Sequence, residues 1–493
     1  MPKQMTAEQK LTYMTETPLP RLVLSLSVPT IVSMLITSFY NMADTYFVGL
    51  IGSASASGAV GVAFPLMAIM QAVGFMFGHG SGNHMARALG AGDAEDAHKM
   101  AATGFFSAFF VGLFIMALGL LAADPLAYAL GSTPTIAPYA KAYLGYLMPG
   151  TPFLIASLVL NNQLRFQGSA FYAMIGITSG AVLNIILDPL FIFTFGMGVA
   201  GAALATSISQ VVSFFLLLAG TRRGGNIRIH WRNFTPTLAN FREILRGGVP
   251  SLARQGLNSL ATVCLNLASG GYGDAAIAAM SIVTRVMMMA VSAIIGFGQG
   301  FQPICGFNYG AGLYERVRRA FWFCVKLCFG VLVVVSAAAI VLAPQIISMF
   351  LADDAQVQQI GTLALRLQCA LMPLFAFTCL SNMMLQTMGI AGRATLLAMA
   401  RQGLFFIPAV WLLEHAFGLL GVQLAQPVAD FFSFLLAIPL TLPVLRSLRD
   451  SEKKFQNREL FAMLFRLICR GRCKRCRAQA GREEQKLRTS PNW

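Results

Sequence analysis

Residues 168–193 read GSAFYAMIGITSGAVLNIILDPLFIF, an apolar run whose only charged side chain is Asp188. A bilayer core requires about 20 apolar residues per helical crossing, so this segment has the length and composition of a transmembrane helix. Comparable runs recur along the chain, and we place spans at 22–48, 56–83, 97–122, 137–163, 168–193, 199–220, 244–270, 276–304, 317–343, 356–385, 391–416 and 420–446. The sequence therefore predicts twelve membrane-spanning helices.

The composition of the whole chain agrees with this prediction. Of its 493 residues, 56% are hydrophobic and only 11% are charged, which is too apolar for a soluble protein of this size. The same composition excludes a disordered chain and a secreted disulfide scaffold. Short alternating strands, which are typical of membrane barrels, are absent from the sequence. We predict an all-α integral membrane protein.

Basic residues divide the predicted connectors into two sets. The N-terminus, five connectors and the C-terminal tail carry 30 of the 36 Lys and Arg residues, whereas the other connectors carry only Lys141. Because basic loops face the cytoplasm, we expect a multi-pass protein of the inner (plasma) membrane with both termini cytoplasmic. The net charge of +16 suits anionic lipid headgroups, so we expect membrane lipids, and not nucleic acid, as partners.

The chain repeats itself at an offset of 220 or 221 residues. Val28-Pro29 aligns with Val249-Pro250, and Gly78-His79-Gly80 aligns with Gly298-Gln299-Gly300. Six helices per repeat bring both halves into the membrane from the same side, so we expect two six-helix bundles related by a pseudo-two-fold axis along the membrane normal. Transporters bind substrate between such halves, although repeats also occur in channels. We predict a cytoplasmic N-terminus (1–20), an N-lobe (21–220), a linker (221–243), a C-lobe (244–446) and a basic tail (447–493).

Two aspartates lie within the predicted spans of the N-lobe. Asp44 follows a polar run in the first span, and Asp188 lies in the fifth with Asn184 one turn earlier on the same helix face. Pro189 removes a backbone donor beside Asp188. A charged group at the middle of a bilayer costs about 2.5 to 3.5 kcal/mol, so each carboxylate must face a cavity or a partner.

The chemistry of two neighbouring buried carboxylates favours binding of a proton or a cation. Desolvation and mutual repulsion both disfavour the doubly charged state. Oxygen ligands suit a hard ion such as Na⁺ better than a transition metal. Asp44 falls at Leu265 in the second half and Asp188 falls next to the repeat offset at Ile407, so we expect the site in one lobe only. The alternative, that both aspartates are structural and satisfied by backbone or hydroxyl groups, stays open.

At these residues the sequence resembles the multidrug and toxic compound extrusion (MATE) family, in its bacterial branch, over about residues 15 to 446. The order and spacing of several short motifs carry the resemblance. They are Pro29 and Asn41-Met-Ala-Asp44 in the first span, Leu89-Gly-Ala-Gly-Asp93 after the second, Asn184-Ile-Ile-Leu-Asp188-Pro189 in the fifth, and Arg401-Gln402-Gly-Leu-Phe-Phe-Ile-Pro408 in the eleventh.

The resemblance implies roles for individual residues. In such family members the N-lobe acids, the fifth-span Asn and a sixth-span Thr bind the coupling H⁺ or Na⁺, and the first helix bends at its proline. The coupling residues are Asp44, Asn184, Asp188 and Thr206, with Pro29 as the bend. Some relatives carry a further acid in the seventh span. Asn258 stands at that position in this chain, so we expect no C-lobe ion site of that type.

Further side chains are candidates for a substrate cleft. Methionine and aromatic side chains form adaptable surfaces that suit flat, apolar cations. Arg401 and Asp430 lie on neighbouring spans and are also predicted to form a structural ion pair, whereas Arg254 is expected to snorkel from a span end. The candidate cleft residues are Tyr40, Asn41, Met67, Met70, Met287, Arg285, Arg401 and Asp430.

Residues at the cytoplasmic ends of the spans have open interpretations. His79 and His84 could relay protons or simply pack near the membrane interface. In the tail, Phe455 to Arg470 has the pattern of an amphipathic basic helix on the inner membrane surface. The tail cysteines lack the second pair or the histidines that a zinc site requires.

These observations favour a secondary active antiporter that exports cationic or amphiphilic drugs in exchange for H⁺ or Na⁺ by alternating access. We expect small-molecule drugs as its substrates, no cofactor beyond the coupling ion, and a monomer. The alternative is a flippase for lipids or lipid-linked oligosaccharides, for which Arg285 and Arg401 are few cationic cleft residues. An integral membrane enzyme is less favoured, because His79, His84 and Asp93 form no recognisable catalytic cluster.

Overall fold

The computed structural model describes residues 5–350 and 354–469, and this part of the chain contains helices and no strand. Contacts between residues divide the chain into two units, Met1–Thr441 and Leu442–Trp493. The last helix, α17, crosses that boundary. The prediction of an all-helical membrane protein is confirmed, and the first unit contains both lobes.

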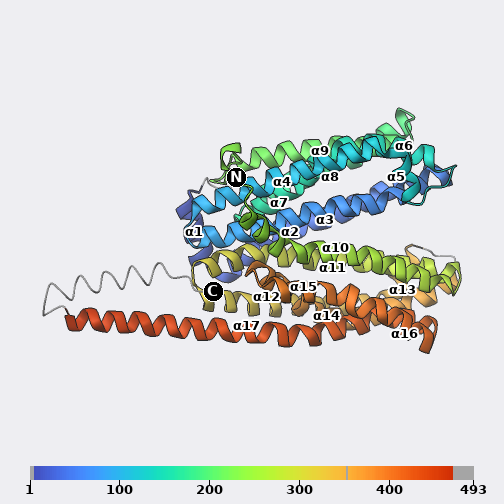
Figure 1. Cartoon of the computed structure of the whole chain (residues 1–493). Coiled ribbons are helices and arrows are strands. Elements are labelled where there is room, and N and C mark those ends of the chain that lie inside the picture. Colours follow the sequence, from blue (N-terminus) through green and yellow to red (C-terminus); the bar gives the residue numbers. More distant parts are fainter. Residues whose placement is uncertain (1–4, 351–353, 470–493) are drawn as a thin grey trace. The chain divides into compact units, whose positions relative to one another are not determined.

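The N-lobe is built from α2 to α9 (Figure 1). The bounds are α2 (Leu19–Gly49), α3 (Ala54–Gly90), α4 (Ala94–Leu121), α5 (Ala123–Ala129), α6 (Ala137–Leu147), the 3-10 turn η1 (Met148–Gly150), α7 (Thr151–Phe166), α8 (Ala170–Pro189), the π-helical turn η2 (Leu190–Thr194) and α9 (Val199–Thr221). A short helix, α1 (Ala7–Glu16), precedes them. Thr6 caps α1, because its hydroxyl accepts a hydrogen bond from the Gln9 N–H while the Gln9 side chain binds the Thr6 N–H.

The C-lobe begins at α10, after a linker that contains the 3-10 turn η3 (Trp231–Asn233). Its bounds are α10 (Leu238–Gly270), α11 (Asp274–Gly310), α12 (Tyr314–Val341), α13 (Ala343–Ser348), α14 (Ala355–Thr387), α15 (Ala391–Met399), the π-helical segment η4 (Ala400–Phe406), α16 (Ile407–Phe417) and α17 (Leu419–Cys469). The predicted fourth and eleventh spans are each two helices joined by a short turn.

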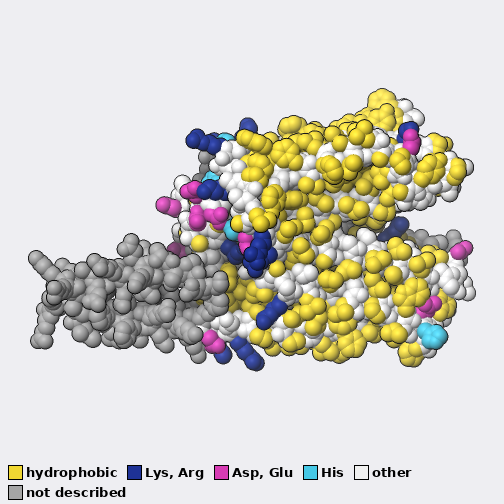
Figure 2. All heavy atoms as spheres, viewed as in Figure 1, with side chains coloured by type: hydrophobic (Ala, Val, Ile, Leu, Met, Phe, Trp, Pro, Cys, Tyr) yellow, Lys and Arg dark blue, Asp and Glu magenta, His cyan; other side chains and the backbone are white. Residues whose placement is uncertain are grey.

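Eleven helical segments of the described residues are long and apolar enough to cross a membrane. The remaining predicted span, 244–270, lies in α10, which carries charged residues such as Arg242, Glu243, Arg246 and Arg254. Figure 2 shows hydrophobic side chains over the long sides of the helices of the first unit, while charged side chains on this face gather mainly at the end where α1 lies. We call this end of the first unit, where α1 and linker residues 221–237 lie, the linker end.

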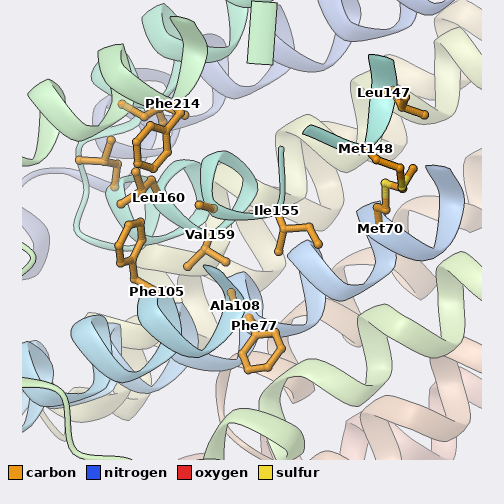
Figure 3. Packing of buried hydrophobic residues seen from close by; sticks show 14 of the residues in the cluster. Met70, Phe77, Phe105, Ala108, Leu147, Met148, Ile155, Val159, Leu160 and Phe214 are labelled. Carbon is orange, nitrogen blue, oxygen red and sulfur yellow. The ribbon is translucent and has the colours of Figure 1, made fainter. Parts of the chain in front are cut away.

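A large apolar core holds most of the N-lobe together, and a smaller cluster around Ala59, Ala127 and Ala140 lies apart from it. Phe105 of α4, Phe214 of α9 and Leu160 of α7 pack against one another at one end of this core, and Met70 and Met148 contribute at the other (Figure 3). In water, burial of one methylene group stabilises a fold by about 0.8 kcal/mol. Within a membrane the helices are held together by close van der Waals packing instead. The core makes the N-lobe a compact frame for the polar side chains described below.

Glycines allow the two lobes to approach closely at the linker end. A Cβ atom at Gly80 of α3 would lie 2.2 Å from the carbonyl oxygen of Ile244, and one at Gly248 of α10 would lie 2.2 Å from that of Met76. A Cβ atom at Gly310 of α11 would lie 2.0 Å from the carbonyl oxygen of Arg87. Small residues let helix backbones meet in this way. The lobe interface is therefore formed by α3 against α10 and α11, and by α2 against α11.

Candidate functional site

A cavity of about 250 Å³ lies between helices of the two lobes. The N-lobe supplies most of its wall, from α2, α3, α7, α8 and α9, and the C-lobe contributes α10 and α11. Of the residues predicted for the cleft or the ion site, six line this cavity: Tyr40, Asn41, Met67, Met70, Asn184 and Thr206.

Two carboxylates adjoin this wall. Asp188 is fully buried, and Asp44 lies close enough for the two negative charges to repel each other. Neither carboxylate is itself in contact with the cavity, but their neighbours Tyr40 and Asn184 are. One oxygen atom of each carboxylate, Oδ1, is buried and lacks a hydrogen-bond partner. Buried polar atoms are usually hydrogen-bonded, so these two oxygens can accept a proton or a cation.

Asn184 holds Asp188 from one helical turn away on α8. In the amide orientation that satisfies both of its ends, the nitrogen donates to Oδ2 of Asp188 at 2.9 Å. The amide oxygen then accepts from the backbone N–H and the hydroxyl of Thr206, at 3.1 and 3.2 Å. The hydroxyl of Tyr40 also lies near the side chain of Thr206. The structure thus brings Asp44, Asn184, Asp188 and Thr206 into one cluster.

The backbone changes its geometry directly after Asp188. Pro189 ends α8 and has no N–H to donate, and the next five residues, Leu190–Thr194, form a π-helical turn. Such wide turns commonly mark functional sites in helices. The change of backbone geometry thus begins two residues after the buried carboxylate of Asp188, next to the proline whose missing donor is evident from the sequence.

The opposite end of the cavity carries two arginines. Arg165, in the last turn of α7, is 2% exposed and donates to Gln299 of α11 and to Asn162, both at 2.5 Å. It also approaches His79 at 3.4 Å. Arg254 of α10 lines the cavity near Arg165. Among the described residues, no carboxylate forms an ion pair with either arginine.

Comparison with known proteins places the chain in a family. A sequence model of the MatE family matches residues 29–190 and 250–412, one segment in each lobe. The chain belongs to the MatE family. It is 28% identical over 436 residues to the multidrug export protein MepA of Staphylococcus saprophyticus, a match that covers 87% of this chain and 95% of that relative.

Solved structures with the same fold support this assignment. One, described as an outward-facing conformation of a multidrug resistance MATE family transporter of the MOP superfamily, has a TM-score of 0.83 and 27% identity. It covers 91% of this chain and 100% of the other. A MOP superfamily transporter from Pyrococcus furiosus has a TM-score of 0.83 and 26% identity, and covers 90% of this chain and 99% of the other. The chain is therefore a multi-pass membrane transporter of the MatE family.

Four predicted cleft residues of this MatE transporter lie outside the cavity wall. Arg285 is exposed, and Met287 is buried with its sulfur 4.0 Å from that of Cys369, whereas the next residue, Met288, lines the cavity. Consecutive residues point about 100° apart around a helix, so Met288 reaches the cavity wall and Met287 does not. Arg401 and Asp430 pair with each other at 2.7 Å inside the C-lobe.

Arg165 and Arg254 are the charged residues among those that line the cavity, and neither is predicted for the cleft from the sequence. The sequence predicts that Arg254 snorkels from a span end and that Arg165 lies in a connector between spans. In the structure both side chains line the cavity. The internal repeat could have indicated this site. Arg165 contacts both His79 and Gln299, and these two residues occupy equivalent positions in the two halves. Polar residues at equivalent positions of the two halves can meet across the lobe interface.

His84 contacts carboxylates from both lobes at the linker end. Its ring nitrogens lie 2.6 Å from Asp96 of α4 and 3.7 Å from Glu243 of α10. Glu243 also lies 3.5 Å from Arg87, which donates at 2.7 Å to the carbonyl oxygen of Thr387 on α14. The geometry gives His84 a structural role between the lobes, which was one of the two interpretations open from the sequence.

Proposed function

We propose that this MatE transporter exports drug-like amphiphiles in exchange for H⁺ or Na⁺. The multidrug export protein MepA, its relative in Staphylococcus saprophyticus, supports the export of drugs. The cavity supports a small-molecule substrate, because Met67, Met70 and Met288 give its wall an adaptable apolar surface.

The observation that carries the coupling is the pair of unpartnered carboxylate oxygens on Asp44 and Asp188. Two buried negative charges near each other are unfavourable until a proton or a cation joins them. The neutralised and the charged cluster therefore stabilise different packings of α2 against α8. A ligand shifts a conformational equilibrium only by its difference in affinity for the two states, and this cluster supplies such a difference for the ion.

Coupling by one lobe fits the distribution of acids in the structure. The positions equivalent to Asp44 and Asp188 in the C-lobe are apolar, and Asp430 is already paired with Arg401. The N-lobe cluster adjoins the cavity through Tyr40, Asn184 and Thr206. Ion binding to the cluster therefore changes the part of the cavity wall that a substrate contacts. Drug and ion then influence each other through this wall although they bind at different sites.

We further propose that the linker end faces the cytoplasm of a cell with the protein in its plasma membrane. The concentration of Lys and Arg in the connectors at this end supports that orientation. Glycine contacts and the hydrogen bonds of Arg87 and Arg165 join the lobes on this side. The structure then corresponds to a state with the cytoplasmic side closed.

Purified protein in liposomes tests the coupling. Ethidium transport is measured with a pH gradient or a Na⁺ gradient imposed alone, and the gradient that drives transport identifies the ion. We expect Asp44→Asn and Asp188→Asn each to reduce ion-driven transport to the level of protein-free liposomes, because a neutral side chain no longer responds to the ion.

The matched control is Asp124→Asn, which removes an acid that is 63% exposed and paired only with Lys141. This control variant should transport ethidium at the wild-type rate. Wild-type rates in Asp44→Asn and Asp188→Asn, with normal amounts of folded protein, would refute the proposed coupling.

A further inference from the structure

The two arginines at one end of the cavity have no negatively charged partner among the described residues. The bonds that Arg165 makes go to neutral groups, Gln299, Asn162 and His79, and its Nε is buried without a hydrogen-bond partner. No hydrogen bond or ion pair is formed by the guanidinium group of Arg254 within the described residues. Arg165 is buried and Arg254 is partly buried. A positive charge held away from water is unfavourable unless it is paired, so this end of the cavity favours a negatively charged ligand.

The neighbouring side chains offer hydrogen bonds but no negative charge. Gln255, Asn161 and Gln299 line the cavity beside the arginines, and Cys379 lies near Arg254. The bonds to Gln299 and Asn162 fix the position of the Arg165 guanidinium, whereas Arg254 keeps its donors for a ligand. A planar guanidinium group binds a carboxylate through two parallel hydrogen bonds, which a lysine cannot do.

The acids lie at the other end of the cavity. Along α8 the wall runs from Ala170, near Arg165 in sequence, to Asn184, which bonds to Asp188. These 14 residues of helix correspond to about 21 Å at 1.5 Å per residue. A carboxylate held by Arg254 therefore does not neutralise Asp44 or Asp188. The two ends can act independently, one on the substrate and the other on the coupling ion.

We propose that Arg254, with Arg165 fixed beside it, forms a binding subsite for the anionic group of the substrate. The favoured substrates are amphiphiles that carry a carboxylate on an apolar or aromatic body, including zwitterions, and not cations alone. The methionines and aromatic side chains of the wall receive the body, while the guanidinium groups receive the carboxylate. This inference rests on the proposed export function and specifies its substrate class.

A pair of dyes that differ only at the carboxyl group tests the subsite. Rhodamine 110 has a free carboxylate, and rhodamine 123 is its methyl ester. Binding to the purified full-length protein is measured by fluorescence anisotropy, so that no ion gradient is involved. We expect the wild-type protein to bind rhodamine 110 more tightly than rhodamine 123. Hydrogen bonds to charged groups are strong enough that Arg254→Gln should weaken rhodamine 110 binding about tenfold and rhodamine 123 binding by less than about twofold.

Two further variants sharpen this experiment. Arg285→Gln removes an exposed arginine of α11 that lies outside the cavity wall, and it should leave both affinities unchanged. Arg254→Lys keeps the charge but loses the planar fork, so it should retain part of the preference for rhodamine 110. Equal affinities of the wild-type protein for the two dyes, or an equal loss for both in Arg254→Gln, would overturn the subsite.

The outcome is separable from that of the ethidium experiment. Loss of ion-driven transport in Asp44→Asn together with equal binding of the two rhodamines would leave the antiporter intact and remove the anionic subsite. Preferential binding of rhodamine 110 together with ion-independent transport would support the anionic subsite and refute the ion coupling.

Discussion

Asp430 and Asp188 are both buried acids, but their surroundings give them different roles. Asp430 accepts from Nε of Arg401 at 2.7 Å and from Gln426 at 2.9 Å, so its charge is compensated. The Arg401 guanidinium also lies 4.2 Å from the centre of the Phe375 ring. Within the described part of the chain, Asp188 is bonded by the amide of Asn184 and keeps one oxygen without a partner. The charge of Asp430 is therefore compensated inside the C-lobe, whereas one oxygen of Asp188 stays available, as the proposed coupling requires.

The stability of the C-lobe tests this distinction. Asp430→Leu leaves Arg401 with a buried, unpaired charge, and we expect it to lower the free energy of unfolding by about 3 kcal/mol. The double variant Arg401→Met with Asp430→Leu removes both charges and should recover most of that loss. Thermal unfolding of the purified protein measures both. Equal destabilisation by the single and the double variant would show that the pair does not act as an ion pair.

Among the elements, α1 makes contacts with both lobes at the linker end. Met14 is 1% exposed, and its carbonyl oxygen accepts from Asn308 of α11 at 3.1 Å. On the N-lobe side, Nζ of Lys10 donates to Ser169 at 3.1 Å and to Asn226 of the linker. Because α1 touches α11 and the loop after α7, separation of the lobes at this end requires α1 to leave at least one of them.

Docking of α1 should depend on pH through Lys10. Burial lowers the pKa of Lys10 from 10.5 to about 8, so the docked helix favours the neutral amine. Between pH 8 and 10.5 the undocked helix binds a proton that the docked one does not, and docking therefore strengthens as the pH rises through this window. Below pH 8 it is weaker and nearly constant.

Limited proteolysis of the N-terminus across pH 7 to 10 measures α1 docking. Wild-type α1 should become better protected above pH 8. Lys10→Met has no amine to titrate and should show protection that is independent of pH, which also corrects for changes in the protease itself. An identical pH profile for the two proteins would contradict the role of Lys10.

Hydropathy located most elements well but missed their ends. The predicted span 199–220 and α9 (Val199–Thr221) nearly coincide, whereas α3 continues to Gly90, beyond the predicted limit of 83, and α17 continues to Cys469 through residues predicted as a separate tail helix. Hydropathy detects the apolar core of a helix, and polar residues extend these helices beyond it. Arg470, the last residue of that predicted tail helix, lies outside the described residues.

The candidate ion cluster was predictable, while the arginine end of the cavity was not. Asn184 and Asp188 share a helix face at a spacing of four residues, so local geometry alone joined them. Whether Arg254 snorkels or lines a cavity depends on which face of α10 packs against α3, and no local pattern decides that. For the same reason Met288, not Met287, reaches the cavity wall. The sequence therefore specified the elements and their charged residues, but not the contacts between lobes.

At the scale of the whole first unit, the lobes meet along α2 and α11 as well as along α3 and α10. The Thr30 hydroxyl of α2 donates to the carbonyl oxygen of Gly296 on α11 at 2.6 Å, and a Cβ at Gly296 would lie 2.8 Å from Cα of Ile31. Two turns further along α2, the hydroxyls of Ser38 and Ser292 lie 2.9 Å apart, in the wall of the cavity. Alternating access requires these helices to separate along part of their length.

A disulfide between α2 and α11 tests whether the lobes move apart there. The hydroxyl oxygens of Ser38 and Ser292 lie 2.9 Å apart, so cysteine sulfur atoms at these two positions would point toward one another. We expect Ser38→Cys with Ser292→Cys to cross-link on oxidation and to stop ethidium transport, and reduction should restore it. Each single cysteine variant, treated with the same oxidant, controls for the native cysteines and should remain active. A fully cross-linked double variant that still transports ethidium would show that α2 and α11 stay together at this level throughout the cycle, and the moving boundary would then lie elsewhere in the N-lobe.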